Sequence, residues 1–580
     1  MNKVKRFAPI CFNEKDSFRT VMEKISTAGK FDLPSGLALS LSAEGKLLGI
    51  LTDGDIRKAL IKGVTLDNSV GPYIRRDPVT IKEKEIKENP IALIVRKLNA
   101  ANRSSSRIEK LIVVDEENRL VDVIGFNEII RISDVRSQNI AVMGQGFVGL
   151  TLALAMANVG FNVIGVEKNN KIVEELNEGR PHFYENGVKD ILKHCLNRGN
   201  YRCVTSLVGI PFDVLIIAVN TPIDTQKGQT DLKDLRDVCT ENAAHIHKGH
   251  VIIQRSTAPV GTGRELVQIF EEISGLEAGL DFFFAVAPER TIEGEAMKEV
   301  SSLTQIIGGF DEASAEAASR IFKPLVGSTV IVESMEAAEL GKLICNANRI
   351  VSFGFANQIA LLADQFNIDA HKLIKAVNEG YPRNPISMPS PGVGGICLKK
   401  DPYILRQSDT TGLATSIVIE ARKANDLMPA YVVNKILDFK KKYYPDISIK
   451  MFLLGFAFKG MPETSDTRDS VAWDIVKLFV EKCNGKCQLY GFDPVIPKEK
   501  LSHPNVKFVD FEEGWKGAHA IIILNNHQFF SKMDIYTAIN PVNRPCLIFD
   551  TWSMLSHEGL LMEEGIILQT MGSFRSSKGF

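Results

Sequence analysis

The sequence contains no uninterrupted apolar run long enough to cross a membrane. Its most apolar long segment, Ile344 to Ala363, is broken by asparagines, a glutamine and Arg349, so a membrane span is not expected. The chain opens MNKVKRFAPICFNEKDSF, and no apolar core of signal-peptide length precedes the returning charges. These absences predict a soluble, cytoplasmic protein.

An excess of charge of one sign is also missing. Lys and Arg total 69 and Asp and Glu total 70, for a formal net charge of -1. This balance excludes a general attraction to nucleic acid or to an anionic membrane. The nine cysteines are scattered and odd in number, which favours a reducing compartment over a disulfide framework. Cys483 and Cys487 have no second pair nearby, so we expect no metal site.

The chain does have length and repeated α/β patterning. Its 580 residues are more than one core unifies, and several domains are expected. We predict two Rossmann-like, doubly wound domains joined by a long central helix and preceded by a smaller α+β module. The predicted segments are the module at 1–135, the first Rossmann domain at 138–330, a central helical domain at 331–440, a second Rossmann-like domain at 447–568 and a flexible tail at 569–580.

Residues 1–135 contain a weak internal repeat. The first copy has strands at Leu37–Leu41 and from Leu48, and the second has strands at Leu111–Asp115 and from Val121. Each copy follows a helical stretch, near 18–28 and 91–100, and ends in a helix start. The pattern resembles a tandem pair of cystathionine-β-synthase (CBS) domains.

The CBS resemblance implies a regulatory adenine-nucleotide site in the first copy. Thr52 and Asp55 match the hydroxyl and carboxylate of the family's nucleotide signature, whereas the aligned residues of the second copy are Gly125 and Glu128. Two interpretations stay open: an adenine-nucleotide site, and a pair of folded modules that bind nothing.

A strand followed by a glycine-rich turn opens the second block. Gly144, Gly146 and Gly149 form a Gly-x-Gly-x-x-Gly motif between a predicted strand from Asn139 and a predicted helix. The first glycine permits a tight turn, the second lets a pyrophosphate approach the backbone, and the third lets the helix pack on the strand. Glu167 follows the next strand, where a carboxylate accepts hydrogen bonds from the adenosine ribose and repels a 2′-phosphate, so NAD is favoured over NADP.

Polar loops follow the next predicted strands. Thr221 comes after 213–219, Thr257 after 251–254, and Glu289 after 282–286. Ligands of open α/β sheets lie outside the carboxyl ends of the strands. We therefore expect these three loops to border one crevice.

A long helical pattern without proline runs from Ser334 to about Phe366. Glu339, Lys342 and Asn346 share one face of it, because residues three or four apart are neighbours on a helix. A Gly-Gly turn then delivers Cys397 to a predicted helix start, with Asp401 one turn later. The helix N-terminus, the flanking lysines and Lys342 are expected to stabilise the thiolate.

The third block repeats the alternation of strand and helix. Strands are predicted at Lys450–Lys459, Cys487–Pro494 and Ala520–Asn525, with a helix that runs through Glu481. This sheet has no glycine fingerprint, so we expect it to close over a substrate.

Taken together, residues 138 to about 560 resemble the UDP-glucose/GDP-mannose dehydrogenase family of nucleotide-sugar 6-dehydrogenases. The motifs that carry the resemblance are the glycine turn, Ser256-Thr257-Ala258-Pro259-Val260, Pro288-Glu289, Glu339-x-x-Lys342-x-x-x-Asn346, Gly394-Gly395-x-Cys397-x-x-x-Asp401, and Gly455-Phe456-Ala457-Phe458-Lys459 followed by Asp466-Thr467-Arg468. The resemblance implies oxidation of a sugar CH2OH to a carboxylate with two NAD. A thiolate explains the second oxidation, because it captures the aldehyde as a thiohemiacetal that can lose a second hydride.

The resemblance also assigns roles to residues. Cys397 is the expected nucleophile, Lys342 stabilises the oxyanion, Asn346 positions it, Asp401 works with Lys342, Glu289 assists thioester hydrolysis and Thr257 orders the water. The expected cofactor residues are Gly144, Gly146, Phe147, Val148, Gly149, Glu167, Thr221, Thr257, Glu293, Lys400 and Arg468. The expected substrate residues are Glu289, Lys342, Asn346, Arg383, Gly392, Gly394, Gly395, Phe458 and Lys459. The counterpart of Arg383 often crosses a dimer interface built on the long helix, so a homodimer or larger assembly is implied.

Some positions depart from the family pattern. Ile396 stands where relatives commonly carry His or Ser, and no arginine follows Asp550. The segment from Tyr381 to Gly395 is more similar to the UDP-N-acetylhexosamine branch than to the UDP-glucose branch, with GDP-mannose third. The main prediction is a UDP-sugar 6-dehydrogenase for surface polysaccharide precursors, gated by the N-terminal pair. The alternatives are a two-electron β-hydroxyacid dehydrogenase, which has no use for Cys397, and a nucleotide-sensing regulator on an inactive scaffold.

Overall fold

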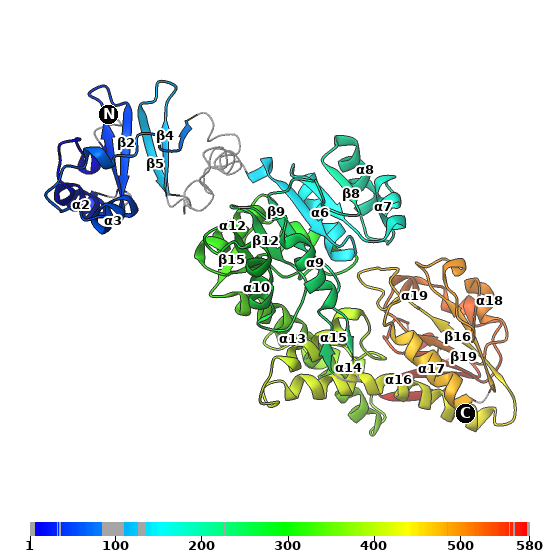
Figure 1. The fold of residues 1–580 in the computed structure, drawn as a ribbon. Helices are drawn as coiled ribbons and strands as arrows, with labels where there is room; N and C mark the ends of the chain where they lie inside the picture. Colours follow the sequence, from blue (N-terminus) through cyan, green and yellow to red (C-terminus); the bar gives the residue numbers. More distant parts are fainter. Residues whose placement is uncertain are drawn as a thin grey trace.

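The computed structural model describes residues 6–31, 33, 36–83, 110–125, 135–224, 228–483, 485–555, 557–560 and 563–576. The chain begins with an N-terminal module and continues with a first α/β sheet that has helices on both faces (Figure 1). A group of long helices follows, and then a second α/β sheet with helices on both faces. The described helices include none with the length and apolar character of a membrane span.

The N-terminal module contains two small sheets. Its elements are α2 (Phe18–Thr27), β1 (Leu37–Leu41), β2 (Leu47–Thr52), α3 (Asp53–Ile61), β3 (Thr80–Lys82), β4 (Lys110–Val114) and β5 (Leu120–Gly125). β1 and β2 form one antiparallel hairpin and β4 and β5 form the other. The hairpin turns meet, because the Leu47 N–H donates to the Asn118 carbonyl at 2.9 Å. Both predicted hairpins are confirmed, whereas Glu128 and the predicted helix near 91–100 lie outside the described residues.

The first large sheet has the strand order β15-β14-β13-β12-β9-β6-β7-β8. Its strands are β6 (Asn139–Met143), β7 (Asn162–Val166), β8 (Tyr201–Val204), β9 (Val214–Ile217), β12 (Val251–Gln254), β13 (Phe283–Val286), β14 (Gln305–Gly309) and β15 (Thr329–Val332). Its helices are α6 (Phe147–Asn158), α7 (Asn170–Asn177), α8 (Val188–Arg198), α9 (Lys233–Ala243), α10 (Thr262–Ser274), α11 (Ala296–Ser302) and α12 (Glu312–Phe322), and a small hairpin pairs β10 (Ile223–Asp224) with β11 (Gln229–Thr230). The strands from β8 to β13 are parallel in Rossmann order, and only the β13–β14 pair is antiparallel.

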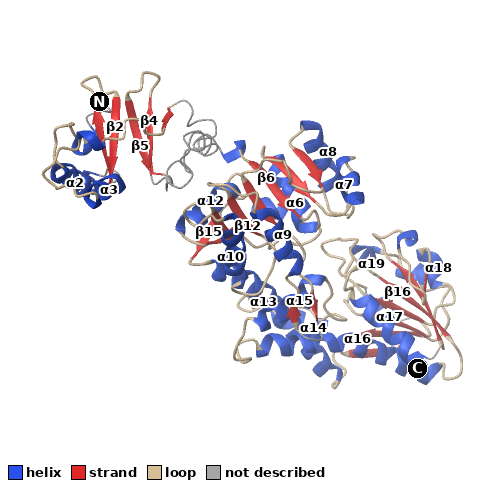
Figure 2. Cartoon of the chain, in the orientation of Figure 1, coloured by secondary structure: helices blue, strands red, loops and turns tan. Residues whose placement is uncertain are grey.

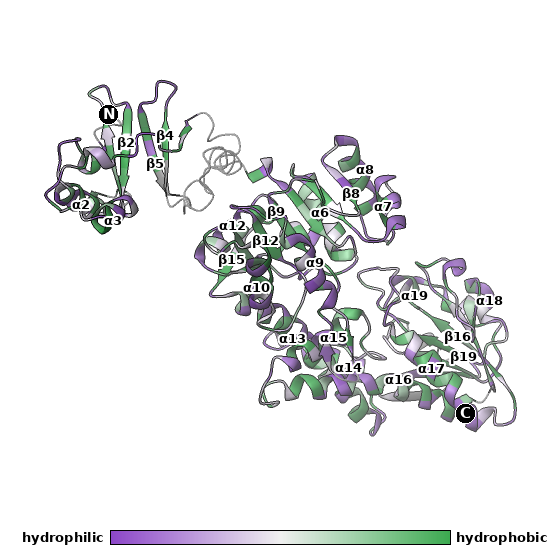
Figure 3. Cartoon of the chain, viewed as in Figure 1, coloured by the Kyte–Doolittle hydropathy of each residue, from purple (hydrophilic) through white to green (hydrophobic). Residues whose placement is uncertain are grey.

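Apolar residues fill both faces of this sheet. The strands are green in the hydropathy view, and purple residues gather on the outer helices (Figure 3). β9 is buried at all four positions. Its sequence is therefore continuously apolar, as expected for a parallel strand that is covered on both faces.

Four helices form the middle of the molecule. They are α13 (Met335–Asp364), α14 (Ala370–Asn378), α15 (Ile396–Gln407) and α16 (Ser416–Tyr443). The Ser334 side chain caps the start of α13 by accepting from the Ala337 N–H. α13 packs most extensively on α16 and α15, so the predicted long helix supports the helix whose first turn contains Cys397.

The second large sheet has the order β18-β17-β16-β19-β20-β21-β22. Its strands are red in Figure 2, next to the label β16 and between helices. Its strands are β16 (Ile449–Leu454), β17 (Cys487–Phe492), β18 (Val506–Phe508), β19 (Ala520–Ile523), β20 (Cys546–Asp550), β21 (Ile566–Thr570) and β22 (Ser573–Ser576), and its helices are α17 (Val471–Cys483), α18 (Phe511–Trp515), α19 (Gln528–Lys532), α20 (Ile535–Ala538) and α21 (His557–Leu560). All its pairings are parallel except that of β21 with β22.

Two expectations for this domain were wrong. Residues 569–576 were expected to belong to a flexible tail. In the structure, the backbone of β22 (Ser573–Ser576) instead pairs with that of β21. The cysteines were expected to be unbridged, but Cys483 and Cys487 form a disulfide between the end of α17 and the start of β17.

Candidate active site

The glycine turn has the shape that a dinucleotide needs. Gly144 has φ +83°, a conformation that favours glycine. A Cβ on Gly149 would lie 1.8 Å from the Gly144 carbonyl oxygen, whereas a Cβ on Gly146 would meet nothing within 4 Å. Gly149 therefore lets α6 pack on the turn, and Gly146 leaves open space at the positive end of α6, where a pyrophosphate fits.

Glu167 lies beside this turn. Its carboxylate accepts from the Gln145 N–H and from the Asn169 N–H, both at 3.1 Å. These bonds fix an anionic group at the end of β7, where a ribose diol can donate to it. The open Gly146 position and the fixed Glu167 carboxylate together fit NAD.

The structure brings the predicted strand-end loops together. The Thr221 hydroxyl donates to the Thr257 carbonyl at 2.6 Å, and the Lys400 ammonium donates to the Thr221 hydroxyl and carbonyl at 3.0 Å each. Lys400 belongs to α15, whose first turn contains Cys397. This one buried lysine therefore connects α15 to the loops that follow two strands of the first Rossmann domain.

Glu289 follows β13 and is 7% exposed. Its carboxylate accepts from the Arg255 guanidinium and from the Arg290 and Thr291 N–H groups. Burial alone would raise its pKa, but the Arg255 charge, the backbone donor and Lys342 hold the pKa of this carboxyl below its ordinary value. Glu289 is therefore held ionised beside the strand ends.

Arg255 was missed as a site residue. It is 3% exposed and also donates to the Ala287 carbonyl and the Gln305 side chain. A charged residue at the end of a buried strand needs an acidic partner, and this signal pointed to Glu289 on the neighbouring strand.

Glu339, Lys342 and Asn346 do share the buried face of α13, at 4%, 8% and 5% exposure. Glu339, however, is turned to the first Rossmann domain, where it accepts from the Gly261 N–H at 2.6 Å and the Gly263 N–H at 2.8 Å. The Glu339 carboxylate thus lies at the N-terminal end of α10. Burial raises the pKa of Glu339 to about 7.

Asn346 and Asp401 join α13 to α15. The Asn346 amide donates to Asp401 Oδ2 at 2.6 Å, and the other Asp401 oxygen is buried without a partner. Lys342 has no hydrogen bond or ion pair with any described residue, although its charge acts on both Glu289 and Cys397. An unpaired ammonium and a free carboxylate oxygen are thus available around the cysteine.

Cys397 lies in the first turn of α15, after Gly395, which has φ +88°. Its side chain is exposed to solvent. Surrounding protein and the Asp401 carboxylate nevertheless raise the pKa of the thiol, against the opposing charges of Lys342 and Lys400. The thiolate expected from the sequence is therefore not the resting form.

The second Rossmann-like domain closes on the glycine loop. A Cβ on Gly394 would lie 2.9 Å from the Asp469 carbonyl oxygen, and one on Gly395 would lie 2.9 Å from the Phe458 ring. The Gly395 N–H donates to the Asp469 carbonyl at 3.2 Å. Side chains at these two positions would push the domain away from the cysteine.

Glu293 of the first Rossmann domain contacts residues of the second Rossmann-like domain. Its carbonyl accepts from the Lys459 ammonium at 2.6 Å, its carboxylate accepts from the Thr464 hydroxyl at 3.3 Å, and an Arg468 nitrogen lies 3.9 Å away. Burial raises the pKa of Glu293 to about 7 and lowers that of Lys459 to about 8. The predicted cofactor residues Glu293 and Arg468 thus meet the predicted substrate residue Lys459.

Two further arginines, Arg383 and Arg349, lie in different surroundings. Arg383 lies in an exposed loop with its guanidinium 5.7 Å from the Tyr381 ring centre, and it makes no hydrogen bond or ion pair within the described part of its own chain. Arg349, which sequence reasoning missed, lies one turn beyond Asn346 on α13 and acts electrostatically on Lys459. Its spacing of seven from Lys342 was the available signal.

In the N-terminal module, Thr52 and Asp55 contact each other. The Thr52 hydroxyl donates to Asp55 at 2.7 Å, both form the cap of α3, and the other Asp55 oxygen accepts from Arg75 at 2.6 Å. The predicted nucleotide residues are therefore adjacent, with the carboxylate engaged by Arg75.

Comparison with known proteins agrees with this geometry. Sequence models of the UDP-glucose/GDP-mannose dehydrogenase family match residues 138–326 (NAD binding domain), 336–427 (central domain) and 452–557 (UDP binding domain). The chain belongs to this family, whose members are NAD-dependent oxidoreductases. A CBS domain matches residues 4–62.

Individual relatives extend over the same region. A UDP-N-acetyl-D-mannosamine dehydrogenase of Campylobacter jejuni is 34% identical over 67% of this chain and 96% of its own length. An NDP-N-acetyl-D-galactosaminuronic acid dehydrogenase of Ralstonia nicotianae is 29% identical over 70% and 94%. The structure of a UDP-D-ManNAc dehydrogenase from Pyrococcus horikoshii aligns with a TM-score of 0.66 at 28% identity, covering 75% of this chain and 99% of that one.

Proposed function

We propose that this chain is a 6-dehydrogenase that oxidises the C6 hydroxymethyl group of a UDP-N-acetylhexosamine to the uronate, with UDP-glucose as the second candidate. The observation that supports the proposal is the Asn346–Asp401 hydrogen bond, which joins the face of α13 that carries Lys342 to α15, the helix that carries Cys397. The product would serve as a precursor of surface polysaccharide.

NAD would be held by the glycine turn, Glu167 and the residues around Thr221 and Lys400. When bound, it supplies the hydride acceptor for both oxidations. The chain's own contribution is to exclude a 2′-phosphate with the Glu167 carboxylate and to fix the strand ends through the Lys400–Thr221–Thr257 contacts.

Cys397 would add to the C6 aldehyde as a thiohemiacetal, which explains why an accessible sulfur lies at this helix start. The sulfur begins as a thiol, so addition requires loss of its proton, and the unpartnered Asp401 oxygen is a nearby acceptor. Lys342 and the Asn346 amide would stabilise the oxygen charge that develops on the former carbonyl.

Water would then cleave the thioester at Cys397. Glu289 and Thr257 border the strand ends on that side. Because the pKa of Glu289 is held below its ordinary value, Glu289 would orient the water rather than store a proton.

The sugar specificity rests on the relatives and on the sequence from Tyr381 to Gly395. Two of the similar proteins are named for N-acetylated sugars. Gly392, Gly394, Gly395, Phe458 and Lys459 would contact the nucleotide sugar.

A substrate panel tests this proposal. UDP-GlcNAc, UDP-GalNAc, UDP-ManNAc, UDP-glucose and GDP-mannose are compared by NADH formation with the full chain. We expect the highest kcat/KM for one of the UDP-N-acetylhexosamines. A highest value for GDP-mannose, or no NADH with any sugar, would overturn the assignment.

The enzyme would act as a homodimer built on α13. Leu340, Ile344, Phe355 and Leu362 on this helix are 40%, 51%, 50% and 52% exposed in the single chain. An exposed apolar helix face usually marks an interface. Arg383, which has no hydrogen bond or ion pair with the described residues, would reach the partner's site.

The N-terminal module would bind an adenine nucleotide at Thr52 and Asp55. Arg75 engages one oxygen of the Asp55 carboxylate, so a ribose hydroxyl that takes that position would displace the ion pair. The nucleotide would therefore compete with Arg75, which links binding to a movement within the module.

A further inference from the structure

A buried arginine holds the loop that carries Cys397. Arg422 of α16 is 2% exposed. Its Nη1 lies 3.4 Å from the Val393 carbonyl oxygen and 3.5 Å from the Leu398 carbonyl oxygen. The two carbonyls lie on either side of Cys397 in the sequence, so one guanidinium joins both flanks of the nucleophile to a long helix.

The Leu398 carbonyl needs this donor. In a regular helix it would accept from the N–H four residues later, but that residue is Pro402, inside α15. Proline has no N–H to donate. The start of the cysteine helix therefore lacks one of its own hydrogen bonds, and the Arg422 guanidinium supplies a replacement from outside.

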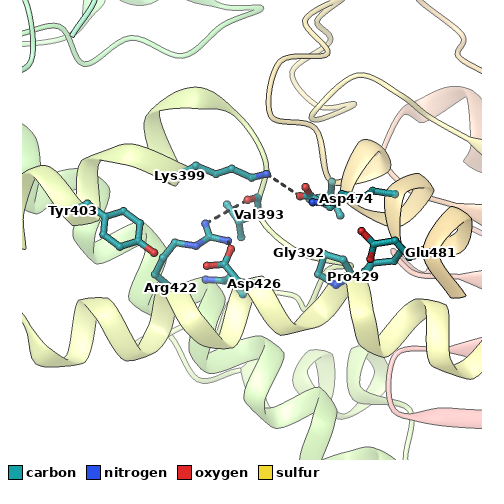
Figure 4. A pocket seen from close by; sticks show the side chains of 13 residues that line it. Gly392, Val393, Lys399, Tyr403, Arg422, Asp426, Pro429, Asp474 and Glu481 are labelled. Atoms are coloured by element: carbon teal, nitrogen blue, oxygen red, sulfur yellow. Dashed lines mark hydrogen bonds and ion pairs between the residues drawn. The ribbon is translucent and has the colours of Figure 1, made fainter. Parts of the chain in front are cut away.

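Val393 and Leu398 pack with Ile350 and Ala421 in a small hydrophobic cluster, but the loop also borders a cavity. A cavity of about 370 Å³ lies between α15, α16 and α17 and is bordered by Gly392, Val393, Tyr403, Asp426 and Asp474. Figure 4 shows Arg422 at this cavity, pointing between Val393 and Asp426. Asp426 accepts from Arg422 Nη2 at 2.5 Å and orients the guanidinium. The polar contacts of Arg422 thus add to the packing of Val393 and Leu398 where the loop borders this cavity.

A second set of bonds fixes the beginning of the same loop. The Ser390 N–H donates to the Asn357 side chain at 2.8 Å, and the Asn357 amide donates to Asn425 at 2.8 Å. All three residues are almost fully buried. Between Val393 and Leu398, the Gly395–Asp469 backbone bond and the two Arg422 contacts hold the segment.

We propose that Arg422 is a positioning residue for Cys397, which acts by fixing the Val393 and Leu398 carbonyls so that the sulfur stays beside Lys342 and Asp401. The inference rests on the proposed function for its meaning in catalysis. The loop geometry itself can be measured without any sugar substrate.

The test compares Arg422→Ala and Arg422→Lys with the matched control Lys423→Ala in the full chain. Lys423 lies on the same helix but is exposed and paired with Glu420. We measure the pH dependence of Cys397 alkylation by iodoacetamide, hydrogen exchange of the peptide that carries Cys397, and steady-state kinetics with the best sugar of the panel.

For Arg422→Ala we expect kcat to fall by about tenfold or more. Hydrogen exchange should rise in the cysteine peptide alone, and Cys397 should be alkylated at lower pH because the sulfur leaves the surroundings that raise its pKa. Guanidinium ion at low concentration should restore part of kcat, because the enlarged cavity admits it, whereas an equal concentration of NaCl should not. Lys423→Ala should match the wild type.

A folded Arg422→Ala protein with wild-type kcat, exchange and alkylation would overturn the proposal. If Arg422→Ala does not fold, Arg422→Lys decides, because lysine keeps the charge but cannot reach both carbonyls and Asp426. Wild-type behaviour of this variant would equally overturn it. The alkylation and exchange results stand even if no UDP-sugar is oxidised, so failure of this inference and failure of the proposed function are distinguishable.

Discussion

Two lysines near Cys397 have different surroundings. Lys342 is buried without an ion pair among the described residues, whereas Lys399 of α15 is paired with Asp474 at 2.8 Å. The sequence predicts that Lys342 and the lysines flanking Cys397 all act on the sulfur. In the structure, the charges of Lys342 and Lys400 act on the Cys397 thiol.

Replacing these lysines should therefore have unequal effects. Lys342→Met removes a positive charge directed at developing oxygen charge and should lower kcat by about 10²–10³-fold. Lys399→Met removes a partly exposed ion pair and should change kcat by less than about threefold. Steady-state kinetics of the two variants check this. Equal losses would remove Lys342 from the proposed mechanism.

Glu339 should make stability depend on pH. Its pKa in the folded protein is about 7, above the ordinary value of 4.5. The folded state then binds the proton more tightly, so this group costs stability as pH rises from about 4.5 to about 7, by at most about 3.4 kcal/mol.

Glu339→Gln removes this titration. We expect the thermal unfolding temperature of the variant, relative to the wild type, to increase steadily between pH 4.5 and pH 7. Other titrating groups are common to both proteins and cancel in the difference. A constant difference across that range would show that Glu339 does not titrate there.

Residues of the site could be predicted where their chemistry is unusual for their position in a helix or a turn. Cys397, Lys342 and the glycine turn were found because their chemistry is unusual for a helix face or a turn. The partner of Glu339 could not be predicted, because it depends on which loop packs against α13. Arg255 offered a signal, a charge at the end of a buried strand, but its pairing with Glu289 depends on how the strand-end loops pack. The raised pKa of the Cys397 thiol likewise depends on the surrounding protein and on Asp401.

At the scale of elements, α13 combines a catalytic face with an exposed apolar face. The buried face carries Lys342 and Asn346, and the opposite face carries Phe355. The helix would therefore align two active sites as it forms the dimer.

Phe355→Glu should break the dimer. A carboxylate buried in an apolar interface is costly, so light scattering should report a monomer with reduced activity. Val208→Glu is the control, since Val208 is 72% exposed in the first Rossmann domain. A dimeric Phe355→Glu protein would place the interface elsewhere.

Strands and helices with clear periodicity could be predicted closely, as for β12 (Val251–Gln254) and α13. β22 could not, because the polar sequence after Gly572 has no apolar alternation and is ordered by pairing with β21. The Cys483–Cys487 disulfide escaped for a related reason: the helix end and the strand start come together only when the domain folds.

At the scale of the whole molecule, the N-terminal module is joined to a complete set of dehydrogenase domains. Its second hairpin repeats the arrangement of the first. The adenine-nucleotide site proposed at Thr52 and Asp55 belongs to this module.

Calorimetric titration of the full chain with ATP and with AMP tests this site. We expect binding heat that is lost in Asp55→Ala, and tighter binding to Arg75→Ala, because no ion pair must open. Absence of heat with both nucleotides would favour a module that binds neither.

The central claim is that Cys397 captures the aldehyde so that one sugar is oxidised twice. The most direct measurement is the number of NADH molecules formed per UDP-sugar consumed, with Cys397→Ala as the matched variant. The account predicts two NADH per sugar for the wild type and no uronate from the variant. One NADH per sugar, or unchanged uronate formation without the sulfur, would contradict it.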